Sequence, residues 1–331
     1  MSTAPSSTCR WQTRSYLGRW PPTKRTQWRE CLSYAVYYAP RGRPRLLLLG
    51  ERIAQRYLEP TDQLIGIIGE PGTGKSSVIR GMFPGLELTN DDAGVNVRPL
   101  PVMQMHREGR FRAQTFHVDA RFELAFSQAH EITEAVRAAL KDNRRVIIEN
   151  FDALYPALGI NAQIMAAVGE EIIVVRPDFF GPFPEDLYRA VEGTAVFRRM
   201  AHTAEDLTAF VLERDFGYPH PAIHSDVPRG FVMECDREPV GLQLDELETK
   251  VLECIQARLP VSYVDEDHIT FGRELLPCTG PRIHLANTGE IEGFRVVRRL
   301  YYDELDDTYC LVGLVGDPKP KHFLGRHLRT P

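Results

Sequence analysis

The sequence lacks the features of membrane proteins and of disulfide-rich proteins. No apolar stretch approaches the roughly 20 residues that a membrane-spanning helix needs. Six cysteines are spread over 331 residues, without a C-x-x-C motif or dense pairing. Such sparse cysteines are typical of proteins in a reducing compartment. Internal repeats and low-complexity segments are also absent. We therefore expect a globular, cytoplasmic protein that has no membrane partner.

Charge of neither sign dominates the chain. The formal net charge is −5, and 26% of the residues are charged against 43% that are hydrophobic. This balance is ordinary for a globular protein, and it provides no overall attraction to nucleic acid or to an acidic membrane. Since a domain holds about 100–200 residues, the length allows two domains.

Acidic residues are missing from the first 29 residues, which contain six Arg or Lys residues and all three tryptophans. Targeting peptides share this composition, and so do basic aromatic arms that bind nucleic acid. Pro21 and Pro22, together with the lack of periodicity, favour a third interpretation, a disordered tail over residues 1–30.

The most specific motif is a phosphate-binding loop, G-x-x-x-x-G-K-S. Its predicted nucleotide-binding residues are Gly69, Glu70, Pro71, Gly72, Thr73, Gly74, Lys75, Ser76 and Ser77. Glycines allow backbone N–H groups to turn towards an anion, and a helix beginning near Lys75 adds the positive end of its dipole. Lys75 can reach the β- and γ-phosphates, and the Ser76 hydroxyl can hold Mg²⁺. The loop therefore predicts that the chain binds ATP with Mg²⁺.

The residues that flank the loop fit this interpretation. A short apolar run at 64–68 predicts a strand buried on both faces, and residues 77–83 can continue a helix until Pro84 and Gly85. The remaining apolar patterns predict strands at 86–89, 146–149, 172–175, 294–297 and 311–315, and helices at 45–58, 122–140, 204–214 and 242–259. Glycines and prolines concentrated at 216–230 indicate a linker.

These patterns predict an α/β fold with two domains. We expect a parallel P-loop sheet with helices on both faces over residues 31–216, and a smaller α+β domain over residues 217–331.

Phosphoryl transfer also needs acids beside the loop, to organise Mg²⁺ and to activate an acceptor hydroxyl. Glu149 ends a β-branched run, and Asp152 is the alternative acid. The pair Asp91 and Asp92 follows the expected strand at 86–89. Because strand C-termini face the ligand crevice of an open α/β sheet, Glu149 can organise Mg²⁺. The Asp pair can act as a base or can simply cap a turn.

The succession of the loop, the Asp pair and Glu149 resembles the uridine kinase and phosphoribulokinase class of P-loop kinases. The resemblance covers roughly residues 61–215. It implies that Asp91 is the general base, that Glu149 ends the Walker-B-type strand, and that Arg198 and Arg199 belong to a phosphate-gripping lid. The family usually has aromatic residues after the acidic pair, and this chain has Ala93 and Gly94 there.

Residues 242–297 resemble a different module, the second additional domain of alanyl- and threonyl-tRNA synthetases, which hydrolyses mischarged aminoacyl-tRNA. The similarity rests on the segments at 244–261, 278–284 and 287–294. In that family an H-x-x-x-H pair and a C-x-x-x-H pair bind zinc, and thiolate and imidazole groups suit this ion.

The resemblance implies zinc ligands at Cys278 and His284, with two extra residues between them relative to the family. The one H-x-x-x-H of this chain is His220 with His224, and Pro221 lies between them. An ordinary core cysteine and surface histidines are the alternative.

The sequence thus predicts an ATP-binding kinase-like phosphotransferase with catalytic residues Lys75, Asp91, Glu149 and Arg199, acting on a small-molecule acceptor. Two alternatives stay open. One is a nucleotide-regulated module that binds tRNA or an aminoacyl ester, and the other is a free-standing aminoacyl-tRNA deacylase.

Overall fold

The computed structural model describes residues 35–89, 100–177, 180–219 and 223–316. The chain divides into two compact units, Met1–Cys31 and Leu32–Pro331, and the described residues all belong to the second. The basic tail of residues 1–30, Asp91 and His220 lie outside the described residues. None of the described helices is long and apolar enough to cross a membrane.

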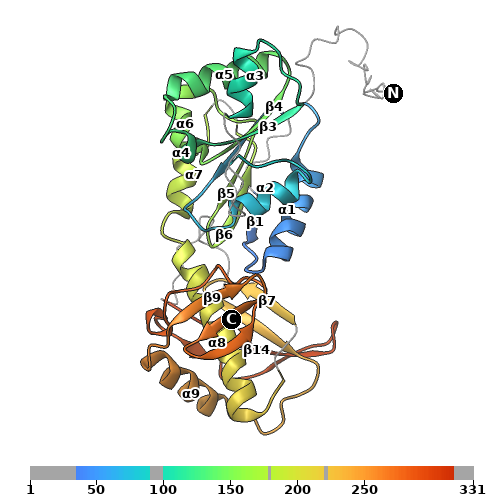
Figure 1. The fold of residues 1–331 in the computed structure, drawn as a ribbon. Coiled ribbons are helices and arrows are strands. Elements are labelled where there is room, and N and C mark those ends of the chain that lie inside the picture. Colours follow the sequence, from blue (N-terminus) through green and yellow to red (C-terminus); the bar gives the residue numbers. More distant parts are fainter. Residues whose placement is uncertain (1–34, 90–99, 178–179, 220–222, 317–331) are drawn as a thin grey trace, which may run out of the picture. The chain divides into compact units, whose positions relative to one another are not determined.

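A six-stranded sheet in the order β1-β6-β5-β2-β4-β3 forms the centre of the first half (Figure 1). Its strands are β1 (Ala35–Tyr38), β2 (Leu64–Ile68), β3 (Thr115–Asp119), β4 (Arg145–Glu149), β5 (Ile164–Val168) and β6 (Glu171–Val175). The four strands β5, β2, β4 and β3 are parallel, whereas β6 and β1 add antiparallel pairs. The predicted all-parallel sheet is therefore corrected to a mixed sheet. Only Gly169 and Glu170 join β5 to β6, and a connection this short can only form a hairpin.

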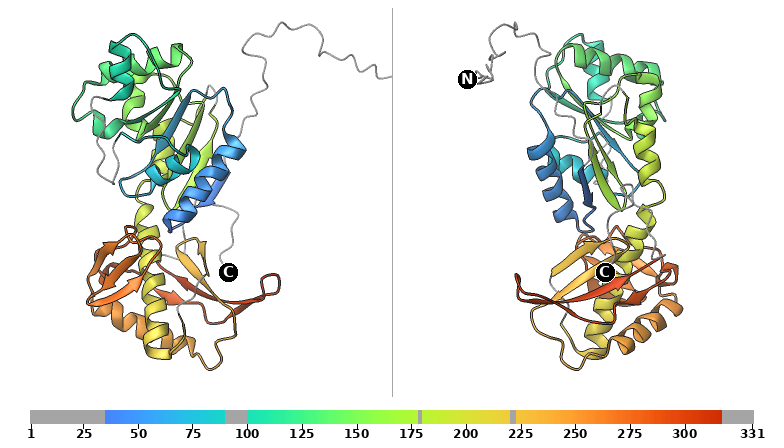
Figure 2. Two further views of the ribbon diagram at one scale, coloured as in Figure 1. Left: turned by 45° about the vertical axis from the view of Figure 1, so that its right-hand side comes forward. Right: turned by 180° about the vertical axis from the view of Figure 1, so that it is seen from behind.

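Helices cover both faces of this sheet (Figure 2). They are α1 (Arg43–Tyr57), α2 (Lys75–Met82), α3 (Pro101–Arg107), α4 (Ala120–Glu123), α5 (Ala129–Lys141), α6 (Phe151–Leu158) and α7 (Pro184–Val191). Side chains of α1 and α2 share one apolar cluster with Ile65 and Ile67 of β2. Those of α3, α5, α6 and α7 share another with Leu64 and Ile68. The strand β2 is buried on both faces, and this explains why its sequence is apolar without interruption.

Two predicted elements differ from the structure. The segment 86–89 is not a strand: Leu88 is buried, but the Thr89 amide donates to His117 Nδ1 instead of joining a sheet. The single helix expected at 122–140 is two helices, α4 and α5. Asp119 caps the first of them, and Gln128 with Glu131 forms a capping box at the second.

The long helix α8 (Ala195–Phe216) begins the second half, and its apolar face packs into a core made mainly by later residues. Those later elements are β7 (Ile223–Val227), β8 (Gly230–Cys235), α9 (Leu244–Gln256), β9 (Val261–Asp265), β10 (His268–Phe271), β11 (Glu274–Pro277), η2 (Thr288–Glu290), β12 (Arg295–Val296), β13 (Tyr301–Asp303) and β14 (Thr308–Leu314). They form a three-stranded sheet, β11-β10-β9, and a five-stranded antiparallel sheet around β14 and β8. Part of the linker expected at 216–230 is instead structured, because residues 223–227 pair with residues 230–234 as a hairpin.

Candidate functional site

The phosphate loop lies between β2 and α2, as the motif requires. Gly69, Gly72 and Gly74 all have positive φ values, of 146°, 75° and 86°. A Cβ atom at Gly69 would lie 2.4 Å from the Val168 carbonyl oxygen, so this position needs glycine. The helix α2 begins at Lys75, directly after Gly74. The local sequence therefore forms a cradle whose backbone amides and helix N-terminus favour an anion.

Lys75 is folded back against the loop in this structure. Its Nζ atom donates to the Glu70 carbonyl oxygen at 2.8 Å and lies 3.7 Å from Glu149 Oε1. Burial lowers the pKa of Lys75, and the nearby Arg121 lowers it further, although Glu149 acts in the opposite direction. Phosphate oxygens in the cradle would favour the charged ammonium, because opposite charges nearby stabilise the ionised form.

The predicted magnesium-organising residue, Glu149, lies beside the loop at the end of β4. Its Oε2 atom accepts from the Ser76 hydroxyl at 3.3 Å, and it is 3.5 Å from His117 Nε2. His117 Nδ1 accepts from the Thr89 amide, so the proton of the neutral ring is on Nε2, facing the carboxylate. The structure thus brings together Lys75, Ser76 and Glu149, all three identified from sequence.

A second acid, Asp119, lies at the end of β3 and was missed. It is paired with Glu149 in the register of β3 and β4. Its Oδ1 atom accepts from Asn150 Nδ2 at 2.7 Å and from the Phe122 amide. Asp91 had been predicted as the acid of the neighbouring strand because a strand was expected at 86–89. A pattern that could have identified Asp119 is the alternation of polar and apolar residues at 115–119, which predicts a strand that ends in an acid.

Arg121 and Asp152 complete this edge of the sheet. The Arg121 guanidinium donates to Asp152 Oδ2 at 3.0 Å and lies 5.4 Å from the centre of the Tyr188 ring. Beyond the larger effects of burial and Glu149, Arg121 lowers the pKa of Lys75, and Asp119 and Asp152 raise it.

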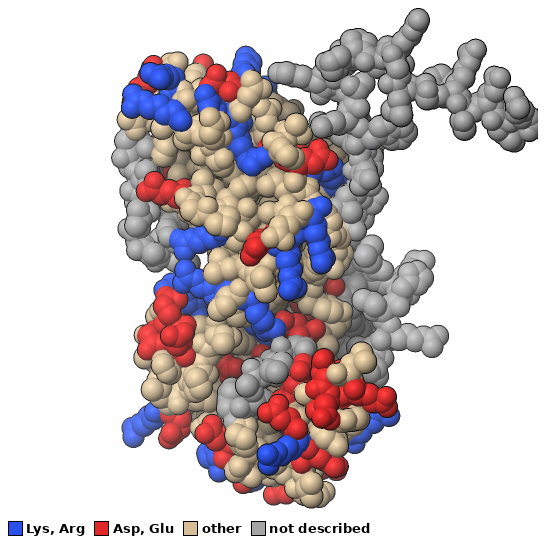
Figure 3. Space-filling view, turned by 90° about the vertical axis from the view of Figure 1, so that its right-hand side faces the viewer, with Lys and Arg blue, Asp and Glu red and all other residues tan. Residues whose placement is uncertain are grey.

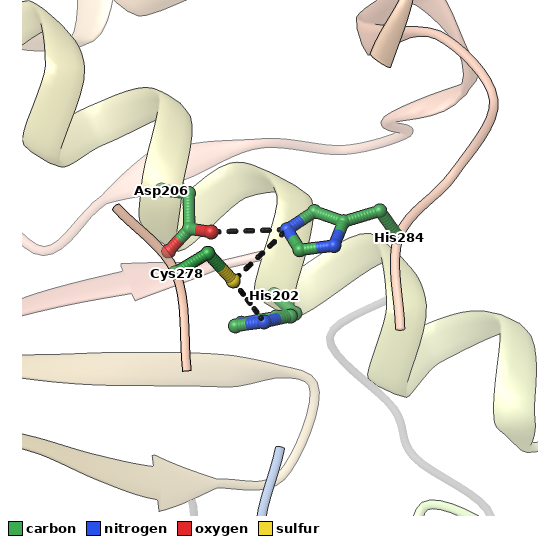
Figure 4. Close-up of side chains that lie close together, drawn as sticks. All are labelled: His202, Asp206, Cys278 and His284. Atoms are coloured by element: carbon green, nitrogen blue, oxygen red, sulfur yellow. Dashed lines mark hydrogen bonds and ion pairs between the residues drawn. The ribbon is translucent and has the colours of Figure 1, made fainter. Parts of the chain in front are cut away.

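A cluster of metal-binding side chains forms the second candidate site. His202 and Asp206 come from α8, and Cys278 and His284 come from the segment that follows β11 (Figure 4). One possible ligand atom from each residue lies within 4.8 Å of those of the others. The contacts are Asp206 Oδ2 to His284 Nε2 at 3.0 Å, Cys278 Sγ to His202 Nε2 at 3.3 Å, and Cys278 Sγ to His284 Nε2 at 3.9 Å.

These distances and donors fit zinc. Tetrahedral bonds of about 2.0–2.3 Å place ligand atoms about 3.3–3.8 Å apart. The three contacts above, of 3.0, 3.3 and 3.9 Å, are close to this range, and all four ligand atoms lie within 4.8 Å of one another. The imidazole nitrogens that face away from the cluster are also held, as is usual for metal-ligating histidines. His202 Nδ1 is 3.2 Å from Glu205 Oε2, and His284 Nδ1 is 3.3 Å from the Pro281 carbonyl oxygen.

Burial governs the protonation of the cluster. It raises the pKa of the Cys278 thiol, and the Asp206 carboxylate raises it further. Burial lowers the pKa of His284, in the direction of the neutral ring that a metal requires. Burial alone would raise the pKa of Asp206, but His202 and His284 bring it below its ordinary value. A cation in the cluster would favour the thiolate, which the metal-free surroundings disfavour.

Of the predicted zinc residues, Cys278 and His284 belong to the cluster and His224 does not. Cys278 and His284 lie together despite the two extra residues between them. His224 lies in the strand β7, where residues four apart cannot form a helical pair. The helical pair is His202 with Asp206, an H-x-x-x-D sequence that differs from the expected H-x-x-x-H.

A cavity of about 650 Å³ adjoins the cluster at His284. Its other lining residues include Val196, Arg199, Val261, Tyr263 and Arg282. Arg282 is held by Glu266 at 3.0 Å and lies over the Tyr263 ring, 4.8 Å from its centre. Arg199, predicted as a phosphate-gripping residue, lines this cavity, and its neighbour Arg198 is the one that contacts the phosphate loop.

Comparisons with known proteins add no family: no family model matches the chain, and a search of curated proteins returned no significant match. The functional interpretation therefore rests on the geometry of these two sites.

Proposed function

We propose that this protein binds a nucleoside triphosphate with Mg²⁺ in the phosphate loop and transfers its γ-phosphoryl group, as a kinase-like phosphotransferase. The observation that carries the proposal is the convergence of three groups. Ser76 Oγ is 3.3 Å from one Glu149 oxygen, and Lys75 Nζ is 3.7 Å from the other. A hydroxyl, a carboxylate and an ammonium at one strand edge suit a magnesium-bound polyphosphate.

Each residue has a distinct role in this proposal. Lys75 and the loop amides neutralise the charge of the terminal phosphates, which is the main requirement of phosphoryl transfer. Ser76 and Glu149 would hold Mg²⁺, directly or through water, and the ion would supply further neutralisation. His117, with its Nε2 atom facing Glu149, orients that carboxylate.

The acceptor hydroxyl needs a base within reach. Asp119 is the described acid nearest in register to Glu149, but Asn150 and the Phe122 amide occupy its Oδ1 atom. These contacts favour a positioning role for Asp119 and leave Asp91 as the proposed base, on the kinase resemblance.

Labelled ATP tests the proposal. The protein is incubated with γ-labelled ATP, Mg²⁺ and a small-molecule extract, and label is sought in organic phosphates. Lys75→Ala should abolish transfer and weaken nucleotide binding, whereas Lys141→Ala, which removes an exposed lysine on α5, should change neither. Nucleotide binding that is equal in wild type and Lys75→Ala would contradict the proposal.

A second function is favoured by the cavity beside the metal cluster. We propose that residues 195–315 bind zinc through His202, Asp206, Cys278 and His284, and that the cavity takes an aminoacyl ester, as in a deacylase or an aminoacyl-binding module. Zinc would supply Lewis-acid chemistry if only three of the four residues bound it, because the fourth coordination position could then take water or the ester. Arg199 and Arg282 provide positive charge for an anionic part of the ligand.

The surface charge bears on whether that ligand is a large RNA. On the face shown in Figure 3, acidic side chains predominate over the lower, C-terminal part. This face does not suit a long polyanion, so we expect no extended tRNA contact on it. Ester hydrolysis that is lost in Cys278→Ala and retained in Lys75→Ala would support the second function. Hydrolysis unaffected by Cys278→Ala would contradict it.

A further inference from the structure

The helix α8 contributes to both candidate sites. Arg198 contacts the phosphate loop, and His202, one turn further along the same helix, belongs to the metal cluster. Residues one turn apart lie on the same side of a helix, so a shift of α8 moves both groups together. This arrangement provides a direct physical connection between the two sites.

Arg198 is buried in an unusual way. It is 3% exposed, and it donates to the carbonyl oxygens of Thr73, at 2.6 Å, and Pro40. No carboxylate of the described residues lies in ion-pair contact with it, and burial lowers its pKa to about 9. Thr73 lies inside the phosphate loop, and so the conformation of the loop depends on where α8 holds this guanidinium.

A second connection passes through the residues that precede α1. Arg41 Nε pairs with Glu205 Oε2 at 3.0 Å, and the same carboxylate oxygen is 3.2 Å from His202 Nδ1. The Arg43 amide donates to the Thr279 carbonyl oxygen at 3.1 Å. Thr279 follows the metal ligand Cys278. The start of α1 is thereby held by both segments that supply metal ligands.

The packing at this point is close. A Cβ atom at Gly280 would lie 2.4 Å from the Arg41 carbonyl oxygen, and the Gly280 amide donates to Cys278 Sγ at 3.2 Å. A metal that fixes its ligands would therefore also fix the residues around Arg41. Through Arg198 it would fix the phosphate loop as well.

We propose that metal binding at the cluster and nucleotide binding at the phosphate loop are thermodynamically linked through Arg198, so that each ligand strengthens the binding of the other. The inference rests on the proposed function and adds its regulation. A metal that fixes α8 against the segment at 278–284 removes conformational freedom that nucleotide binding would otherwise have to remove. The linkage is reciprocal, because binding free energies form a closed cycle.

Two titrations of the full chain test this linkage. Protein is stripped of metal, freed of chelator by gel filtration, and divided into zinc-loaded and metal-free samples. A non-hydrolysable ATP analogue with Mg²⁺ is then titrated calorimetrically into each sample. We expect binding to be at least about fivefold tighter with zinc, and zinc binding to be tighter by the same factor with nucleotide.

Variants locate the route. Arg198→Leu should reduce the ratio of the two affinities to about one while zinc stoichiometry is retained. Arg214→Leu, which removes an exposed arginine near the end of the same helix, should leave the ratio unchanged. Arg198→Lys, which keeps the charge but cannot contact both carbonyl groups, provides a second variant if Arg198→Leu does not fold.

The possible outcomes are distinct. Equal nucleotide affinities with and without zinc overturn the linkage and leave both binding sites standing. A ratio unchanged in Arg198→Leu overturns the proposed route. Absence of nucleotide binding in either sample overturns the proposed function itself, and absence of zinc binding overturns the metal centre together with the linkage.

Discussion

The hydroxyl of Ser76 lies 3.3 Å from the carboxylate of Glu149, although 73 residues separate them in the chain. The contact follows from sheet topology. The strands β2 and β4 are parallel neighbours, with Ile67 opposite Glu149, so their C-terminal ends meet at one edge. The residue that follows the phosphate loop lysine and the residue that ends β4 must therefore share a site.

Glu149→Gln should weaken the effect of Mg²⁺ on nucleotide binding. The substitution keeps the shape of the side chain and removes the charge that would hold the ion. We expect the apparent Mg²⁺ affinity to fall by about 10–100-fold, as when other groups that position a metal are changed. A magnesium titration of fluorescent nucleotide binding measures this. Glu134→Gln, at a side chain that is 72% exposed, is the matched control. Equal magnesium midpoints in both variants would contradict the assignment.

Gly69→Ala should destabilise the protein more than Gly85→Ala does. Both glycines have positive φ values, of 146° and 82°, which L side chains rarely adopt, so both substitutions carry a backbone cost of about 1–3 kcal/mol. Only at Gly69 would the new Cβ also meet a backbone atom, the Val168 carbonyl oxygen, because nothing lies within 4 Å of the position at Gly85. Urea unfolding of the two variants measures the difference in the free energy of unfolding. Similar midpoints would show that the loop relaxes without loss.

Cobalt binding should report the thiolate in the metal cluster. We expect one Co²⁺ per chain, with a charge-transfer absorption band that is lost in Cys278→Ser because sulfur supplies that band. Cys254→Ala removes another buried free cysteine and should retain the band. Zinc should displace the cobalt, since both ions accept the same donors and Zn²⁺ generally binds them more tightly than Co²⁺. A band of equal intensity in Cys278→Ser would exclude this cysteine as a ligand.

Asp62→Ala should be among the most destabilising single changes outside the two sites. Both carboxylate oxygens of Asp62 accept from Arg176, at 2.7 and 2.8 Å, and the aspartate is 2% exposed. Removing one partner of such a buried pair costs about 3–5 kcal/mol, because the other charge stays buried. Asp142→Ala, at a more exposed pair with Arg144, should cost at most about 1 kcal/mol. Denaturant unfolding at constant pH compares the two variants, and equal losses would contradict the prediction.

The phosphate loop could be predicted from sequence because its chemistry is local. A strand, a glycine-rich turn and a helix follow one another within about twenty residues, and the structure has β2 at the predicted bounds, Leu64–Ile68. Glu149 was also found, since a carboxylate after three β-branched residues indicates the end of a buried strand.

The metal cluster could be predicted only in part. Cys278 and His284 are six residues apart, whereas Asp206 and His284 are 78 apart, and no local pattern joins the latter pair. The helix at 204–214 was expected, but its start at Ala195 was not, so His202 was not placed on it. In addition, Asp206 stands where the expected H-x-x-x-H motif has its second histidine, so the motif could not be recognised.

The acids beside the phosphate loop were incompletely predicted for a related reason. The strand β3 contains His117 between Phe116 and Val118, and an isolated polar residue weakens the apolar pattern of a buried strand. That histidine is explained by distant neighbours: the Thr89 amide donates to Nδ1, and Glu149 Oε2 lies 3.5 Å from Nε2, which makes no hydrogen bond among the described residues. Asp119 was missed together with the strand.

The spacing between Arg198 and His202 restricts how this protein can change. Inserting a single residue between them would rotate the rest of α8 by about 100°. Either the guanidinium or the imidazole would then leave its partners, whichever half of the helix kept its place. We expect substitutions to be tolerated along this stretch far more readily than any alteration of its length.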